Sequence, residues 1–271
     1  ELNWRDRIKD FNYRIGFNLY DLQSEITKFN NEINLLGTYR KGQKIGEIWG
    51  YETEGFYQSD TDVQNHADQS KLGANWAPGD IMYKDLDGNK KINNGSNTLD
   101  DHGDLKVIGN TTPRYQYGIT ANMSYKNVYL NVFFQGIGKR DFWPSSQPFW
   151  PVATQYYNTQ KWFVTDSWSE DNRDAYFARP IARETKNQQK QTKYLQDASY
   201  CRLKNLTVGY DFPKSWLSFL HVAKAGVYFS AENLFEFTNV KGAYDPEAAG
   251  KNGTMVYPFQ RTYSFGLNVT F

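Results

Sequence analysis

Strict alternation of apolar and polar residues over long runs constrains this chain more than any other feature. In 261–271, side chains such as Phe265 and Leu267 fall on one face of an extended chain, whereas Ser264 and Asn268 fall on the other. The same alternation recurs in five earlier segments. We therefore predict six strands, near 10–24, 114–125, 127–138, 199–211, 224–238 and 260–271.

The predicted strands are unusually long. Each has about ten residues or more, whereas strands of soluble proteins most often have about 5–6. A strand that crosses a bilayer at a tilt needs about 9–11 residues. No run approaches the ~20 apolar residues of a membrane-spanning helix. The sequence therefore predicts an all-β chain that forms a segment of a transmembrane antiparallel β-barrel.

The connections between the predicted strands alternate in length. Lys126 and Asn127 form a hairpin turn, and the segment that opens with 211–213 is also short. Long loops are predicted near 30–112, 139–197 and 239–259. Tight turns at one end and long extracellular loops at the other are typical of outer-membrane barrels. The alternative is a soluble β-sandwich.

Six strands are too few to close a barrel, because the smallest single-chain barrels have about 8. Open sheet edges are untenable in lipid, where each backbone N–H and C=O needs a partner. We therefore expect further N-terminal strands outside this chain, unless several copies assemble.

Composition narrows the choice of partners. Aromatic residues make up 17% of the chain although apolar residues reach only 39%, a mixture that suits contact with both water and an apolar phase. Lys and Arg number 31 against 30 Asp and Glu, a net charge of +1. This balance gives no reason to expect a nucleic-acid partner. Cys201 is the only cysteine, which excludes an internal disulfide.

Several segments together resemble the C-terminal portion of a SusC/RagA-type TonB-dependent outer-membrane transporter. They are 78–89, 107–110, 132–136, 197–210, 231–235, 244–247 and 257–258. The resemblance implies about six strands of a 22-stranded barrel. It also implies that the whole transporter imports a glycan or oligopeptide across the bacterial outer membrane. The barrel would lie in outer-membrane lipid, and a SusD-like surface lipoprotein would cover its extracellular loops as a lid. An iron-chelate receptor of the same barrel class is the alternative within transport.

The family's N-terminal plug and its TonB-contacting part have no counterpart in this sequence. Residues 1–271 are therefore expected to form only the C-terminal part of the barrel, with the plug domain and N-terminal strands absent from this chain. The TonB complex is expected to act through that absent part.

No catalytic motif is present. The chain lacks a nucleophile elbow, a phosphate-binding loop and a zinc-protease helix, and His66, His102 and His221 are far apart in sequence. We predict no enzymatic activity and no catalytic residue.

Asp85, Asp87 and Asn89 occupy positions 1, 3 and 5 of a turn that resembles an EF-hand loop, which predicts a Ca²⁺ site. Lys90 stands where such loops have Gly, and Ser96 stands where they have a bidentate Glu. Asp100, Asp101 or Asp104 could fold back to replace the missing ligand. The alternative is a solvated turn in which these side chains cap their own backbone.

The loop near 139–197 is rich in aromatic residues with polar neighbours, which suits contact with sugar rings or peptides. Docking of the lid protein and packing of loop on loop are the alternatives, and a soluble sandwich would use the same loop to bind carbohydrate. The predicted substrate or lid contacts are Trp143, Trp150, Tyr156, Tyr157 and Trp162.

Phe271 ends the last alternating run. A C-terminal aromatic residue in this position resembles the signal read by the barrel-assembly machinery of outer membranes.

Overall fold

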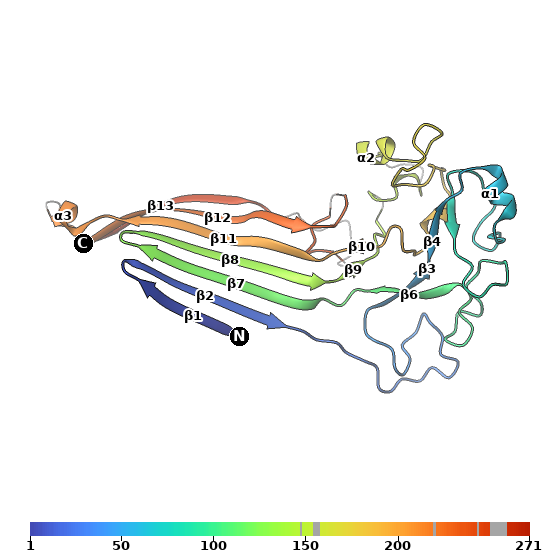
Figure 1. The fold of residues 1–271 in the computed structure, drawn as a ribbon, viewed down its shortest axis with the longest axis horizontal. Coiled ribbons are helices and arrows are strands. Elements are labelled where there is room, and N and C mark those ends of the chain that lie inside the picture. Colours follow the sequence, from blue (N-terminus) through green and yellow to red (C-terminus); the bar gives the residue numbers. More distant parts are fainter. Residues whose placement is uncertain (147, 154–157, 219–220, 243, 250–258) are drawn as a thin grey trace.

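The computed structural model describes residues 1–146, 148–153, 158–218, 221–242, 244–249 and 259–271. Seven long strands of these residues form one antiparallel sheet, ordered β1-β2-β7-β8-β11-β12-β13 (Figure 1). Their bounds are Leu2–Ile8, Phe11–Tyr20, Arg114–Tyr125, Val128–Lys139, Tyr200–Asp211, Lys224–Thr238 and Thr262–Thr270, in the same order.

The six strands predicted from alternation are all present, but the count is wrong by one within the described residues, because β1 was not predicted. In β1 the apolar face carries Leu2, Trp4 and Ile8, and Asp6 interrupts it. This interruption in a short strand hides the alternation. Pairing with β2 still places Leu2 opposite Phe17 and Trp4 opposite Ile15, so β1 continues the same face.

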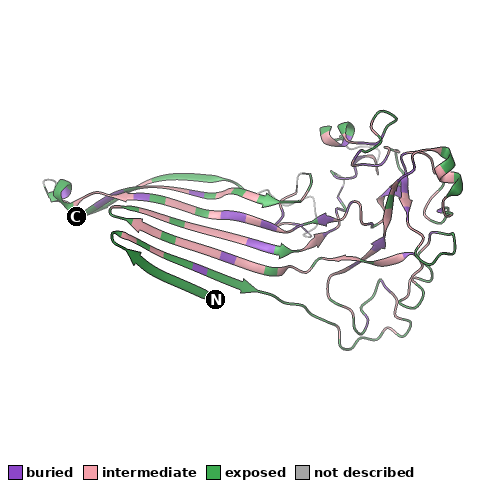
Figure 2. Cartoon of the chain, viewed as in Figure 1, coloured by how far each residue is buried: buried purple, intermediate pink, exposed green. Residues whose placement is uncertain are grey.

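One face of the sheet is apolar across all seven described strands. Side chains paired directly across neighbouring strands lie on the same face. Tyr13 opposes Met123, and Phe229 opposes Phe265. The face is open, with Phe265 84% exposed. Figure 2 shows both edge strands, β1 and β13, exposed along nearly their whole length. Since contiguous exposed apolar surface of this extent marks contact with another apolar phase, the sheet is built to face lipid or a partner.

The opposite face is polar. Arg14 on β2 lies between Arg5 on β1 and Asn122 on β7, and Asn131 on β8 opposes Thr207 on β11. A polar face behind an apolar one is the alternation expected of a barrel wall with a hydrated lumen.

The two ends of the sheet differ. At the turn end, Lys9–Asp10 join β1 to β2 and Lys126–Asn127 join β7 to β8, with Lys9 and Lys126 both at φ 53°. The short helix α3 (Lys214–Leu217) and the C-terminus also lie there (Figure 1). The long connections all leave from the loop end.

The long connections contain short elements of their own. Three two-stranded ladders pair β3 (Glu47–Tyr51) with β6 (Leu105–Asn110), β4 (Thr53–Phe56) with β5 (Ile81–Tyr83), and β9 (Asp141–Phe142) with β10 (Gln196–Asp197) in the described residues. The helices are α1 (Asp60–Asn65) and α2 (Lys161–Thr165), with 3-10 turns at Pro151–Ala153 and Lys186–Gln188. Ser59 caps the N-terminus of helix α1 and forms a capping box with Asp62.

The main hydrophobic core lies in these connections and not in the sheet (Figure 2). It combines residues of 51–92 with residues of 149–194, among them Tyr83, Phe149, Phe177 and Tyr194. The first two long connections therefore fold together into one packed unit, here called the loop unit.

No helix among the described residues has both the length and the apolar character needed to cross a membrane.

Candidate functional site

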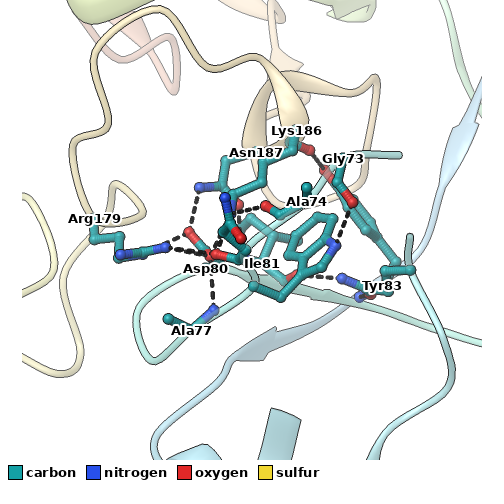
Figure 3. Close-up of polar contacts among 12 residues, drawn as sticks. Gly73, Ala74, Ala77, Asp80, Ile81, Tyr83, Arg179, Lys186 and Asn187 are labelled. Carbon is teal, nitrogen blue, oxygen red and sulfur yellow. Dashed lines mark hydrogen bonds and ion pairs between the residues drawn. The ribbon is translucent and has the colours of Figure 1, made fainter. Parts of the chain in front are cut away.

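A buried ion cluster joins the two halves of the loop unit (Figure 3). Asp80, which is 0% exposed, accepts hydrogen bonds from Arg179 Nε at 2.8 Å, Asn187 Nδ2 at 2.9 Å and Ala77 N at 3.0 Å. Lys186 Nζ lies 2.9 Å from Asp80 Oδ2. Buried charges are stable only when they are paired and hydrogen-bonded, and Asp80 meets both conditions.

The charge on Asp80 is strongly favoured. Burial alone would raise the pKa of this carboxyl, but the hydrogen bonds from Arg179, Asn187 and Lys186 outweigh it and lower the pKa below its ordinary value. Asp80 therefore stays ionised at neutral pH and holds segments from both long connections in place.

A groove of about 560 Å³ opens on the loop unit. It falls within the range of about 300–1,000 Å³ that is usual for small-molecule sites. Both halves of the loop unit contribute to its walls. The lining includes Trp49, Tyr51, Lys71, Asn94, Trp143, Gln189 and Lys190.

Trp49 is held as a fixed platform in this groove. The guanidinium carbon of Arg40 lies 5.2 Å from the centre of the Trp49 ring, and Glu47 Oε2 accepts hydrogen bonds from both Arg40 Nη2 at 2.7 Å and Trp49 Nε1 at 3.2 Å. The Arg40 side chain is only 5% exposed. A bulge between Ile48 and Trp49 interrupts the pairing of β3 with β6, and such bulges re-aim side chains.

Trp143 is supported in a similar way. Its ring lies 6.0 Å from that of Trp150. Trp150 is buried and donates from Nε1 to Pro144 O at 2.6 Å. Trp150 therefore fixes the position of Trp143 at the groove.

Gly50 allows the two halves of the groove to meet. Tyr51 N donates to Lys190 O at 2.8 Å, and Thr192 N donates to Tyr51 O at 3.1 Å. A Cβ on residue 50 would lie 2.5 Å from Lys190 O, which is closer than side-chain carbons approach. Only glycine fits where this backbone crosses β3.

No protein-family model matches the chain, but known proteins resemble it in sequence and in fold. TonB-dependent receptor P3 of Formosa agariphila is 33% identical over 245 residues, which are 86% of this chain and 23% of that receptor. SusC of Bacteroides thetaiotaomicron is 22% identical over 97% of this chain and 25% of its own length. The structure of the RagAB peptide transporter superposes with a TM-score of 0.68 and 23% identity, over 98% of this chain and 28% of that one.

The chain is related to the SusC- and RagA-type TonB-dependent receptors. The resemblance predicted from sequence is confirmed, and so is the fold class of an antiparallel barrel segment. The chain spans about a quarter of the length of these relatives, which is consistent with a C-terminal portion. Their names describe receptors and transporters and not enzymes.

Two segments that carried the resemblance to SusC contact each other. Arg202, in 197–210, is 1% exposed and lies 2.7 Å from Asp245 and 2.6 Å from Glu247, in 244–247. Glu247 also lies 3.2 Å from Lys204 Nζ. These ion pairs tie the described part of the third long connection to β11.

The aromatic residues predicted as substrate or lid contacts have different positions. Trp143 lines the groove. Trp150 lies in the core, and the centre of the Trp162 ring lies 4.6 Å from that of Phe177. Both positions match the alternative of loop packing on loop. Tyr156 and Tyr157 lie outside the described residues. Trp49 was not predicted, because a lone Trp in a long polar segment carries no signal until its partners are known.

The structure brings Asp104 to the predicted calcium turn. Oxygens of Asp85, Asp87 and Asp104 lie within 4.8 Å of one another. Backbone amides use the same oxygens, since Gly88 N donates to Asp85 at 2.8 Å. Asn89 Oδ1 accepts a hydrogen bond from Lys91 N at 2.8 Å. Such bonds are those expected of the alternative, a turn in which the side chains cap their own backbone. Calcium binding therefore stays a prediction.

Phe271 follows β13 at the turn end and is 92% exposed. Its role as a barrel-assembly signal also stays a prediction.

Proposed function

We propose that this chain forms barrel wall and extracellular loops of a TonB-dependent importer that carries a glycan or oligopeptide across the bacterial outer membrane. One observation carries the proposal. A sheet of membrane-crossing strand length has an open apolar face and a polar face, and its long connections fold into a unit at one end only. This polarity fits a wall with lipid outside, a hydrated lumen inside and a binding surface toward the medium.

A SusD-like lipoprotein is the proposed partner at the loop end, and the TonB complex supplies the energy through a part of the protein that this chain does not include. The relationship to SusC and to the RagAB peptide transporter supports this assignment. It also favours a nutrient importer over an iron-chelate receptor of the same barrel class.

The soluble sandwich alternative requires two sheets packed face to face. In the described part of the chain, one large sheet leaves its apolar face uncovered and the remaining ladders have two strands each. Such a face would aggregate in water.

The test uses cells that express the full-length receptor containing this chain. Cells are given a mixture of oligosaccharides and tryptic peptides, and mass spectrometry follows their removal from the medium. We expect removal of one class to require the receptor and to stop when a protonophore dissipates the proton gradient. Removal that persists without the receptor, or recovery of the receptor in the soluble fraction, would overturn the proposal. Co-purification of a surface lipoprotein in detergent tests the partner.

A further inference from the structure

Most of the polar side chains that line the groove have no hydrogen-bond partner among the described residues; the exception is Gln188, whose Nε2 donates to Glu184 O at 3.1 Å. Lys71, Asn94, Gln189 and Lys190 also line the groove, and none of these side chains forms a hydrogen bond or ion pair with another described residue. Some other polar groups of the loop unit are held by several partners, whereas Gln58 Oε1 and Trp168 Nε1 are buried without a partner among the described residues. Gln191 Nε2, one of the former, contacts Tyr83 Oη, Asn187 O and Gln189 O at 2.9–3.2 Å. The groove thus holds polar side chains that are available to a ligand.

The charges of the lining have one sign. Lys71 and Lys190 are the charged side chains among the described lining residues. No carboxylate lines the groove with them, although the charge of Lys71 interacts with the Asp68 carboxylate nearby. The neighbouring Glu52 is already paired with Lys84 and Lys106. The groove therefore favours an anionic ligand. The Arg40 guanidinium, which lies over the Trp49 ring, makes binding of a cationic ligand unfavourable.

The aromatic and amide side chains indicate what else the ligand carries. Trp49 and Trp143 are flat apolar surfaces held by the contacts described above, and such surfaces stack on the C–H faces of pyranose rings. Asn94 and Gln189 each offer a donor and an acceptor, which matches sugar hydroxyls.

A peptide fits this groove less well. Peptides commonly bind by adding a strand to an open sheet edge. β3 has β6 on one side and the 190–192 segment on the other, so neither side of β3 is open at the groove.

We infer that the groove binds an acidic oligosaccharide, in which Trp49 and Trp143 stack on sugar rings and Lys71 and Lys190 pair with carboxylate or sulfate groups. The inference rests on the proposed import function and narrows its substrate class.

The experiment measures binding by calorimetry to the full-length receptor in detergent, at low salt. The probes are oligogalacturonate and the same oligomer with its carboxyl groups methyl-esterified. We expect the acidic oligomer to bind at least tenfold more tightly. The double substitution Lys71→Gln/Lys190→Gln should lower the affinity for the acidic oligomer about tenfold, because the ion pairs of exposed lysines are individually weak. Lys41→Gln, at an exposed lysine in the same connection but outside the lining, is the matched control and should change nothing.

Trp49→Phe keeps an aromatic ring, whereas Trp49→Ala removes it. We expect the first to retain most of the affinity and the second to lose it for both oligomers. Equal binding of the two oligomers, indifference to the Lys71 and Lys190 substitutions, or displacement by an acidic peptide but not by oligogalacturonate would overturn the inference. Binding needs no energy source, so these outcomes are separate from a failure of protonophore-sensitive uptake, which would count against the import function.

Discussion

Asp80 and Lys186 form an ion pair that is shut off from water, with 2.9 Å between Asp80 Oδ2 and Lys186 Nζ and side chains only 0% and 2% exposed. Asp80 belongs to the connection between β2 and β7, and Lys186 to the connection between β8 and β11. The Lys186 ammonium also donates to Ala74 O and Asn75 O and lies 4.8 Å from the Trp76 ring. The pair is therefore the central link of the loop unit.

Asp80→Asn should destabilise the loop unit by about 3–5 kcal/mol, because it leaves Lys186 charged and buried without a counterion. Hydrogen exchange in the full-length receptor should show faster exchange at Tyr57 and Ile81, whose amides bond to this cluster. Glu170→Gln removes an exposed pair with Arg173 and is the control, with an expected effect below about 1 kcal/mol. Unchanged exchange in Asp80→Asn would contradict a linking role.

Acid should open the loop unit through Asp80. Its pKa in the folded protein is lowered, so its contribution to stability is fully present above the ordinary Asp pKa of about 3.9. That contribution is lost as the pH falls through the lower folded value. Pepsin cleavage between pH 5 and pH 2 should therefore rise in the loop unit below about pH 4. Asp80→Asn should lack this step, and an identical acid profile in both proteins would refute the assignment.

Gly50→Ala should separate β3 from the 190–192 segment. The new methyl group would meet Lys190 O, a backbone atom that cannot move without breaking its bond to Tyr51 N. We expect a local loss of about 1–3 kcal/mol, read from faster amide exchange at Tyr51 and Thr192. Gly37→Ala is the matched control, since a Cβ there meets nothing within 4 Å.

Chelation tests the calcium prediction. If Asp85, Asp87 and Asp104 hold Ca²⁺, EDTA should lower the protease resistance of residues 71–104 in the intact receptor, and added Ca²⁺ should restore it. Asp87→Ala should mimic EDTA, whereas Asp100→Ala, at an exposed residue outside the cluster, should not. No response to EDTA would leave the capped turn as the better account.

The strands of the large sheet could be predicted because their two faces meet different environments. In β13 every second side chain is apolar, and the structure pairs Phe265 with Phe229 on one face and Ser264 with Ser230 on the other. The short strands β3 to β6 could not be predicted in this way. Their side chains pack into a core formed by two distant segments, so their pattern follows the shape of that core and not a flat boundary.

The groove shows the same limit. Trp143 stands out in an aromatic-rich segment, but Trp49 gains meaning only from Arg40, Glu47 and the bulge at its own position. From the sequence, Asp100, Asp101 or Asp104 could have approached Asp85. The structure shows that it is Asp104, because the fold of this connection brings its carboxylate close. Contacts between segments far apart in the chain decide both sites.

The direction of the two outermost strands has a consequence for the whole barrel. Each step across the sheet reverses the chain, and an even number of steps separates β1 from β13, so the described sheet has edges that both run from the loop end to the turn end. A wall that joins these edges by antiparallel pairing must contain an odd number of additional strands, of which the first and the last both run from the turn end to the loop end. The seven described strands thus already fix whether the number of remaining strands is odd or even.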